Sequence, residues 1–396
     1  MLAEAAKKIA VVSKNPSKPH FNHYLFETLC LLIKICQRNV ADSAQSRTSA
    51  FFEDTLFPPF EEILRNDVQE FMPYVFQVLA LILGSKRTRS GLTDGYKALF
   101  PFLLAPELWT KSGNIPGLVA LIQAYIKVGP DFVVEQHLMP VLGAFQSLLA
   151  SKANDPHVFS ILNSLIEHNA IESLPKPTLL KILNLIFTRI SRTRTTKFVK
   201  NFVYFVSLFV LRYGPINLIH LIEEIQNGLF TMFVDKIYLP DVTKVDGKIE
   251  KNVCNVALIR FLTDAPDIML NDKNSELWAK LLTALVQLSQ NIAENSGGDD
   301  DEVDLDVLNG GGESAVGDYA AAYSQLIYAC CADSDPTSGF STNGQTLVAY
   351  FGQCLQKLAQ TPPYGECLSA AVKLLDESTR NYVQQRIFVS IGINGS

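Results

Sequence analysis

Two helical patterns of hydrophobic residues follow one another in residues 51–84, FFEDTLFPPFEEILRNDVQEFMPYVFQVLALILG, with a short polar break at Arg65–Asn66. The second pattern repeats with a period near 3.6, which is typical of one face of an α-helix; its members are Val68, Phe71, Met72, Val75, Leu79, Ile82 and Leu83. A lone helix pair of this kind would leave much apolar surface in water, so it requires similar pairs on both sides, as in a helical solenoid. We expect any binding by this pair to come from its polar positions, such as Gln69, Glu70 and Gln77.

The helix pair recurs along the chain at a regular spacing. Prolines fall inside the expected first helices, 43 and 39 residues apart, at Pro58, Pro101 and Pro140. The expected second helices begin at intervals of 47, 41 and 40 residues, at Asp67, Asn114, Asp155 and Thr195. Repeats of about 40–47 residues with two helices each are those of HEAT and armadillo proteins. The sequence therefore predicts an all-α fold, a curved HEAT-repeat superhelix of antiparallel helix pairs.

Length and composition agree with one long repeat array. The 396 residues are 48% apolar and 19% charged, which is ample material for a core. The net charge of −6 argues against a general nucleic-acid binder. The most apolar run, 202–211, is half the roughly 20 residues needed to span a membrane, so we expect a buried helix and no membrane insertion. We predict HEAT repeats in 1–294, an acidic glycine-rich loop in 295–313, and terminal HEAT-like helices in 314–396.

The sequence lacks familiar catalytic and nucleotide-binding motifs. It contains no GxxxxGK[ST], HExxH, GxSxG or CxxC pattern. His20, His23 and Glu27 stand at i, i+3 and i+7 of one expected helix and could offer two imidazoles and a carboxylate to zinc. No fourth ligand is implied, so we prefer a solvated helix face. We therefore expect no enzyme, no metal and no cofactor.

Basic residues cluster at two turns between expected helices. The first cluster contains Arg192, Arg194, Lys197 and Lys200. Its two lysines fall in the first turns of a helix, where cations oppose the helix dipole at a small cost. That cost mildly favours a binding role over a plain solvated turn. Lys86 and Arg87 form the second cluster. Because aromatic residues are not interleaved and the chain is negative overall, we expect an acidic protein partner and no nucleic acid.

One acidic segment is a further candidate for partner binding. Asp299, Asp300, Asp301 and Glu302 are framed by glycines, and both features oppose a packed structure. The segment could meet a basic surface, as a partner-binding or autoinhibitory element. The alternative is a solvated loop without a specific role.

Several segments, in colinear order, are similar to a known family. They are SKNPSKPHFNHYLFETLC (13–30), NDVQEFMPYVFQVLALIL (66–83), SGNIPGLVALIQAYI (112–126), ASKANDPHVFSILNSLIEH (150–168), TTKFVKNF (195–202) and YSQLIYA (323–329). They resemble the exportin-2 family, the importin-α re-exporters of the importin-β (karyopherin-β) superfamily. The chain looks like the C-terminal part of such a receptor, and its first residues read as the last helix of an array that began earlier.

The resemblance implies a transport function. Family members are continuous HEAT superhelices that bind importin-α cooperatively with Ran in its GTP form, pass the nuclear pore and release cargo when GTP is hydrolysed. They catalyse nothing themselves. The resemblance thus implies importin-α, Ran-GTP and nuclear pore components as partners, and shuttling between nucleus and cytoplasm. The alternative is a HEAT-repeat scaffold or regulatory subunit with no dependence on nucleotide state.

Overall fold

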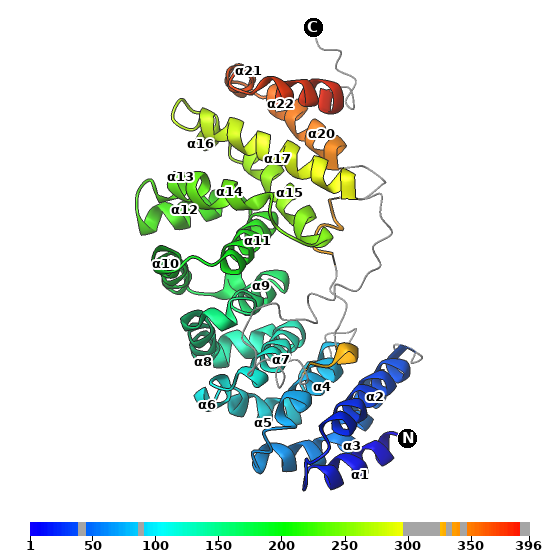
Figure 1. Ribbon diagram of the computed structural model, residues 1–396. Helices are drawn as coiled ribbons and strands as arrows, with labels where there is room; N and C mark the ends of the chain where they lie inside the picture. The colour runs from blue at the N-terminus through cyan, green and yellow to red at the C-terminus, as the bar shows by residue number, and fades with distance from the viewer. Residues whose placement is uncertain (39–44, 86–90, 296–324, 330–334, 341–346, 389–396) are drawn as a thin grey trace. The chain divides into compact units, whose positions relative to one another are not determined.

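The computed structural model describes residues 1–38, 45–85, 91–295, 325–329, 335–340 and 347–388 (Figure 1). Helices make up the regular structure of these residues, and no strand occurs among them. No helix in the described ranges is long and apolar enough to cross a membrane. The chain divides into two compact units: unit 1 is Met1–Ser173 with Asp301–Asp333, and unit 2 is Leu174–Asp300 with Ser334–Ser396.

Unit 1 is a stack of helix pairs. Its helices are α1 (Leu2–Val12), α2 (Pro19–Arg38), α3 (Gln45–Arg65), α4 (Met72–Gly84), α5 (Asp94–Leu103), α6 (Pro106–Trp109), α7 (Ile115–Val128), α8 (Pro130–Ala150) and α9 (Ser160–Glu167), with short 3-10 turns η2 (Ser112–Asn114), η3 (Lys152–Asn154), η4 (Ile171–Ser173) and η6 (Ile327–Ala329). The second helices α2, α4, α7 and α9 contact one another in that order, and the first helices α1 and α3 lie side by side.

Helix α4 lies at the centre of this stack, and each of its residues is buried. Its contact with α7 is close because α7 has a glycine there. A Cβ atom added at Gly117 would lie 3.0 Å from both the Phe76 Cβ and the Pro73 carbonyl oxygen, tighter than ordinary contact. The run of apolar residues that suggested a helix needing neighbours is therefore the core of unit 1.

Unit 2 continues the same construction. Its helices are α10 (Lys176–Arg192), α11 (Thr196–Tyr213), α12 (Pro215–Ile225), α13 (Leu229–Phe233), the π-helix η5 (Val234–Tyr238), α14 (Leu239–Val242), α15 (Lys248–Thr263), α16 (Pro266–Met269), α17 (Ser275–Asn295), α20 (Leu347–Ala359), α21 (Tyr364–Val372), α22 (Glu377–Tyr382) and the π-helix η7 (Val383–Phe388). Helix α11 contacts α15, and α15 contacts α17. The apolar run 202–211 lies in α11 and is buried except for Tyr204, as predicted for a core helix.

The predicted register is confirmed at most positions. Prolines lie inside α3, α5 and α8 at the predicted places. Asn114 precedes α7, and Thr195 caps α11 by accepting a hydrogen bond from the Phe198 amide at 3.1 Å. Two predicted starts were wrong: α4 begins at Met72 and α9 at Ser160. Asp67 has φ +48°, outside the helical region, and Asp155 lies in a turn.

Polar contacts join neighbouring pairs at about one repeat length. In unit 1, the Lys111 Nζ lies 3.0 Å from the Asp67 Oδ1, 44 residues away. The Lys127 Nζ donates a hydrogen bond to the Gly84 carbonyl at 2.7 Å, 43 residues away. Such contacts hold each pair in register with the next one. Whether 1–294, 295–313 and 314–396 are separate regions stays a prediction, since 296–324 lie outside the described residues.

Candidate protein-binding surfaces

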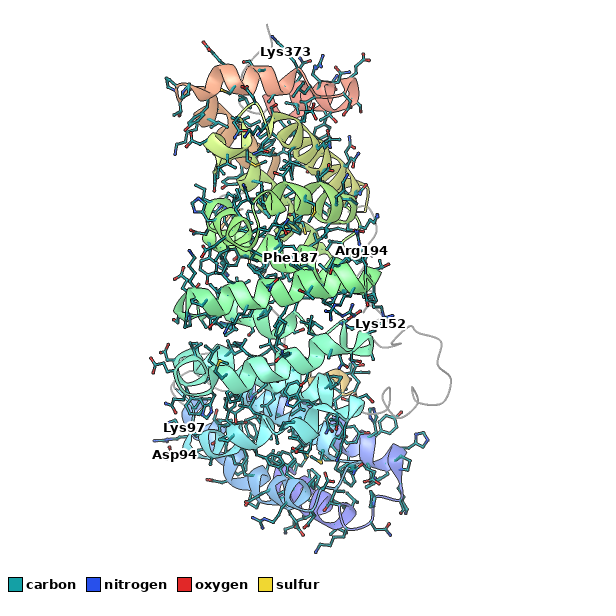
Figure 2. All side chains as sticks on the ribbon, turned by 90° about the vertical axis from the view of Figure 1, so that its left-hand side faces the viewer. Asp94, Lys97, Lys152, Phe187, Arg194 and Lys373 are labelled. Carbon is teal, nitrogen blue, oxygen red and sulfur yellow. The ribbon has the colours of Figure 1, made fainter. Side chains whose placement is uncertain are left out.

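The basic turn predicted from the sequence joins α10 to α11 in unit 2, and Figure 2 labels Arg194 there. Its residues divide into two groups. Arg194 Nη2 lies 2.6 Å from the Asp241 Oδ2, and Lys200 Nζ lies 2.6 Å from the Asp246 Oδ2. Arg192 and Lys197 are exposed and have no ion-pair partner among the described residues. Two of the four predicted cations therefore link neighbouring repeats, and the other two are exposed.

The next repeat adds cations to the same place. Lys244 contacts Asp241, while Lys236 and Lys280 both contact Asp235, at 2.8 and 2.7 Å. In these ion pairs five cations meet three carboxylates. We call this surface the basic edge; its cations are Arg192, Arg194, Lys197, Lys200, Lys236, Lys244 and Lys280.

Two cations of the basic edge change the pKa of a neighbouring carboxylate, Asp235. Hydrogen bonds from Lys236 and from Lys280 lower the pKa of Asp235 to about 2. This carboxylate thus stays ionised in all but strongly acidic solution, and it leaves excess positive charge around it. The arrangement is suited to an acidic protein surface, because exposed cations attract carboxylates over the Debye length of about 10 Å.

The remaining predicted partner-binding residues lie outside the described residues. They are Lys86, Arg87, Asp299, Asp300, Asp301 and Glu302. Their roles stay predictions.

One of the three candidate zinc ligands on α2, Glu27, binds the backbone of a distant segment. Glu27 is only 6% exposed, and both of its carboxylate oxygens accept hydrogen bonds from the backbone of η6, from the Ile327 amide at 2.7 Å and the Tyr328 amide at 3.0 Å. His23 Nε2 lies 3.7 Å from the Glu27 Oε1. No group of three potential metal ligands occurs in the described parts of the chain. The preferred interpretation, histidines on a solvated face, is confirmed for His20, which is exposed, whereas His23 is partly buried. The burial of Glu27 by a segment about 300 residues later was not predicted.

Gln77 on α4 takes part in the same contact. Its side-chain oxygen accepts a hydrogen bond from the Leu326 amide at 2.8 Å. Gln77 was one of the polar positions from which we expected binding, and the structure shows it binding a segment of the same chain. Sequence periodicity contains no signal for this contact. The only hint is that Gln77 interrupts an otherwise apolar helix.

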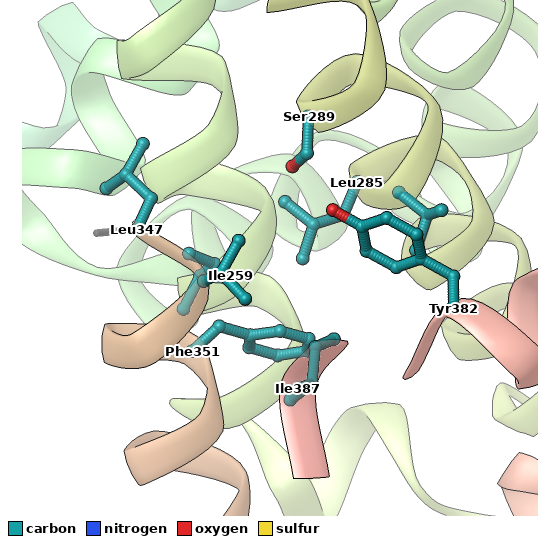
Figure 3. Close-up of a pocket in the computed structure, with 9 residues that line it drawn as sticks. Ile259, Leu285, Ser289, Leu347, Phe351, Tyr382 and Ile387 are labelled. Atoms are coloured by element: carbon teal, nitrogen blue, oxygen red, sulfur yellow. The ribbon is translucent and has the colours of Figure 1, made fainter. Parts of the chain in front are cut away.

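A small apolar pocket lies in unit 2 among α15, α17, α20, α22 and η7 (Figure 3). Figure 3 shows Phe351, Tyr382 and Ile387 facing it, and Ser289 at its rim. The residues that line it include no carboxylate, amine or imidazole that could act as a base toward the Ser289 hydroxyl. The pocket therefore offers no catalytic set.

Comparison with known proteins identifies the family. Residues 1–385 match the family model described as "CAS/CSE protein, C-terminus". The chain belongs to this family. It is 42% identical to zebrafish Exportin-2 over 366 residues, which cover 92% of this chain and 36% of that protein. It is 39% identical to human Exportin-2 over 388 residues, which cover 97% of this chain and 38% of that protein.

A solved structure shows the same fold. The exportin Cse1 in its cargo-free, cytoplasmic state aligns with a TM-score of 0.75 and 23% identity, covering 98% of this chain and 37% of Cse1. The likeness confirms the all-α HEAT-repeat solenoid predicted from the repeat spacing. The chain thus spans little more than a third of the length of the relatives it matches.

Proposed function

We propose that this chain is the C-terminal part of a nuclear export receptor that carries importin-α from nucleus to cytoplasm in a complex with Ran-GTP. The observation that carries the proposal is the match of residues 1–385 to the C-terminal family model, together with 42% identity to zebrafish Exportin-2. A role without catalysis is supported by the absence of known catalytic motifs from the sequence. On this proposal the receptor shuttles between nucleus and cytoplasm and contacts nuclear pore components in transit.

The repeat architecture suits this function physically. Each helix pair contacts mainly its neighbours, so small rotations at each interface add up along an array and can change the grip on a partner. Polar contacts such as Lys111–Asp67 and Arg194–Asp241 bridge those interfaces and would move with them.

The direct test is a chimaera. The C-terminal segment of zebrafish Exportin-2 that aligns with this chain is replaced by the chain, and binding of importin-α is measured with Ran loaded with GTP or GDP. We expect a complex with Ran-GTP and none with Ran-GDP. A chimaera that folds, by circular dichroism and gel filtration, yet does not bind would contradict the proposal. Binding that is equal in both nucleotide states would support a scaffold instead.

We propose further that the basic edge contacts an acidic surface of a protein partner. Support comes from the exposure of Arg192 and Lys197 and from the excess of cations in the neighbouring ion pairs. Neither residue holds the repeats together, so both can be altered without touching the fold.

A further inference from the structure

Three consecutive backbone amides in unit 1 are held by two side chains from neighbouring helices. The amides belong to Leu326, Ile327 and Tyr328, at the start of η6. Gln77 on α4 accepts the first, and the two carboxylate oxygens of Glu27 on α2 accept the second and third, at distances of 2.8, 2.7 and 3.0 Å. All three hydrogen bonds are donated by backbone N–H groups, and none of them involves a side chain of the bound segment.

Both acceptors are held in place by the helices that carry them. The Gln77 Nε2 donates a hydrogen bond to the Pro73 carbonyl at 2.9 Å, which fixes the amide so that its oxygen faces the Leu326 amide. Glu27 lies one turn after His23, whose Nδ1 is 3.4 Å from the Tyr74 hydroxyl on α4. Glu27 is 6% exposed and Gln77 is 8% exposed. Two buried polar side chains, Glu27 on α2 and Gln77 on α4, thus form a preorganised binding site.

The segment in the site is held by three backbone hydrogen bonds, but only one of its three side chains is buried. Leu326 is 1% exposed, whereas Ile327 and Tyr328 are 50% and 44% exposed. The site therefore takes one apolar side chain and three free amides. Helices α2 and α4 meet independently of it, because the rings of Phe26 and Tyr74 stack with centroids 4.9 Å apart. The segment can leave without separating the helices.

Occupancy matters for Glu27 in particular. A buried carboxylate without a partner is costly, and hydrogen bonds from backbone amides to a carboxylate are charge-assisted and strong. In a repeat protein, contacts ordinarily join neighbouring repeats. Here the two backbone amides that donate hydrogen bonds to Glu27 come from 300 and 301 residues later in the chain. A carboxylate at this position is thus matched to a distant segment and not to an adjacent repeat.

We propose that Glu27 and Gln77 form a peptide-binding site on α2 and α4, and that the chain's own Leu326–Tyr328 turn occupies it reversibly. We call it the amide site. Its ligand class is a short turn with three consecutive unbonded backbone amides and a leucine-sized apolar side chain at the first of them. The site requires neither importin-α nor Ran, so it stands independently of the transport function.

Hydrogen exchange tests occupancy of the amide site in the full chain. We expect the amides of residues 326–328 to be protected. Glu27→Gln should speed exchange at Ile327 and Tyr328 by about tenfold or more, the effect of losing one charge-assisted hydrogen bond, while α2 and α4 stay protected. Glu70→Gln is the matched control, because Glu70 is an exposed glutamate in the same unit that lies just before α4, the helix that carries Gln77. Unprotected amides in the unaltered chain, or equal effects of the two variants, would overturn the proposal.

A peptide in trans tests whether the site is exchangeable. The probe is a labelled, end-capped peptide of residues 323–329, YSQLIYA, and the readout is fluorescence anisotropy. The unaltered chain should bind it weakly, since its own tethered segment competes at high effective concentration. Two variants should bind it more strongly: Leu326→Asp, which buries a charge, and Ile327→Pro, which lacks the donated N–H.

Circular dichroism of both variants verifies that the helices remain. Adding Glu27→Gln to either variant should abolish the gain in binding. If neither folded variant binds the peptide more strongly than the unaltered chain, the amide site is rejected.

Discussion

Two buried carboxylates, Asp241 in unit 2 and Glu27 in unit 1, are stabilised by different kinds of partner. Asp241 is 8% exposed and contacts Arg194 and Lys244, with Arg194 one repeat away in sequence. Glu27 is 6% exposed and contacts backbone amides 300 and 301 residues away. The first pairing follows from the repeat itself, because equivalent positions in adjacent pairs face one another. The second requires a segment that belongs to no neighbouring repeat.

The two regions should be alike in their cores. Phe26 and Phe202 are fully buried; Phe26 lies in α2, which carries Glu27, and Phe202 lies in α11, which carries Lys200. Alanine at either position should lower the free energy of unfolding by about 3–5 kcal/mol, through lost burial and the cavity left behind. Chemical denaturation measures the loss, and Phe51→Ala, at a residue that is 54% exposed, is the control. A loss below about 1 kcal/mol at one site only would mean that the regions differ in packing as well as in polar partners.

Double-mutant cycles should distinguish the side-chain partner of Asp241 from the backbone partners of Glu27. Asp241→Ala and Arg194→Ala should each cost about 1–3 kcal/mol, with a coupling near 1 kcal/mol, because each removes the other's side-chain partner. Glu27→Gln should show no coupling with Tyr328→Ala, since Glu27 accepts from a backbone amide. It should couple with Ile327→Pro, which deletes such an amide. Coupling between Glu27 and the Tyr328 side chain would contradict the backbone assignment.

Low pH should weaken the ion pairs that Asp235 forms with Lys236 and Lys280. Lys236 and Lys280 depress the pKa of Asp235 to about 2, below its ordinary value of 3.8. A depressed pKa stabilises the folded state fully above the ordinary value, and this contribution is lost as pH falls from about 4 to about 2. The difference in unfolding midpoint between the unaltered chain and Asp235→Asn should therefore shrink across that range, and it should be smaller in high salt. A difference that is constant with pH would rule out the ion pairs as its source.

The smallest effect on stability should come from Arg192 and Lys197, the two cations of the basic edge that form no ion pair among the described residues. Arg192→Glu with Lys197→Glu should change the free energy of unfolding by no more than about 0.5 kcal/mol, because neither side chain has an ion-pair partner among the described residues. Binding of an acidic partner by the chimaera should nevertheless weaken, most strongly at low salt. Lys7→Glu with Lys8→Glu is the matched control, with equal charge change on the exposed face of α1 in unit 1. Equal losses in the two double variants would assign the effect to net charge.

The sequence predicts those features that depend on local spacing. Helix caps such as Thr195 and the prolines inside first helices were found because their chemistry acts within a few residues. The start of α4 was misplaced because Asp67 has a positive φ and so lies outside the helix. Aspartate tolerates this conformation, but its presence does not predict it. The pairing of Arg194 with Asp241 was missed although both residues stand one repeat apart, since periodicity gives the spacing of helices and not the reach of side chains.

The amide site was beyond sequence reasoning for a different reason. Its three donors are backbone groups, which every segment possesses, and its acceptors look like ordinary polar positions on α2 and α4. Only the fold brings them together.

The distance along the chain between Glu27 and Tyr328 has a consequence for biosynthesis. Helix α4 packs against α2 on one side and α7 on the other, and all three precede residue 130, so the helices that carry the two acceptors can assemble long before the segment is made. The segment that completes Glu27 is made 300 residues later, which at about 5–20 residues per second is a delay of roughly 15–60 s. During that interval the nascent chain presents an empty amide site. A ribosome stalled before residue 326 should therefore carry a folded helix pair that captures the YSQLIYA peptide, whereas one stalled beyond the turn should capture far less.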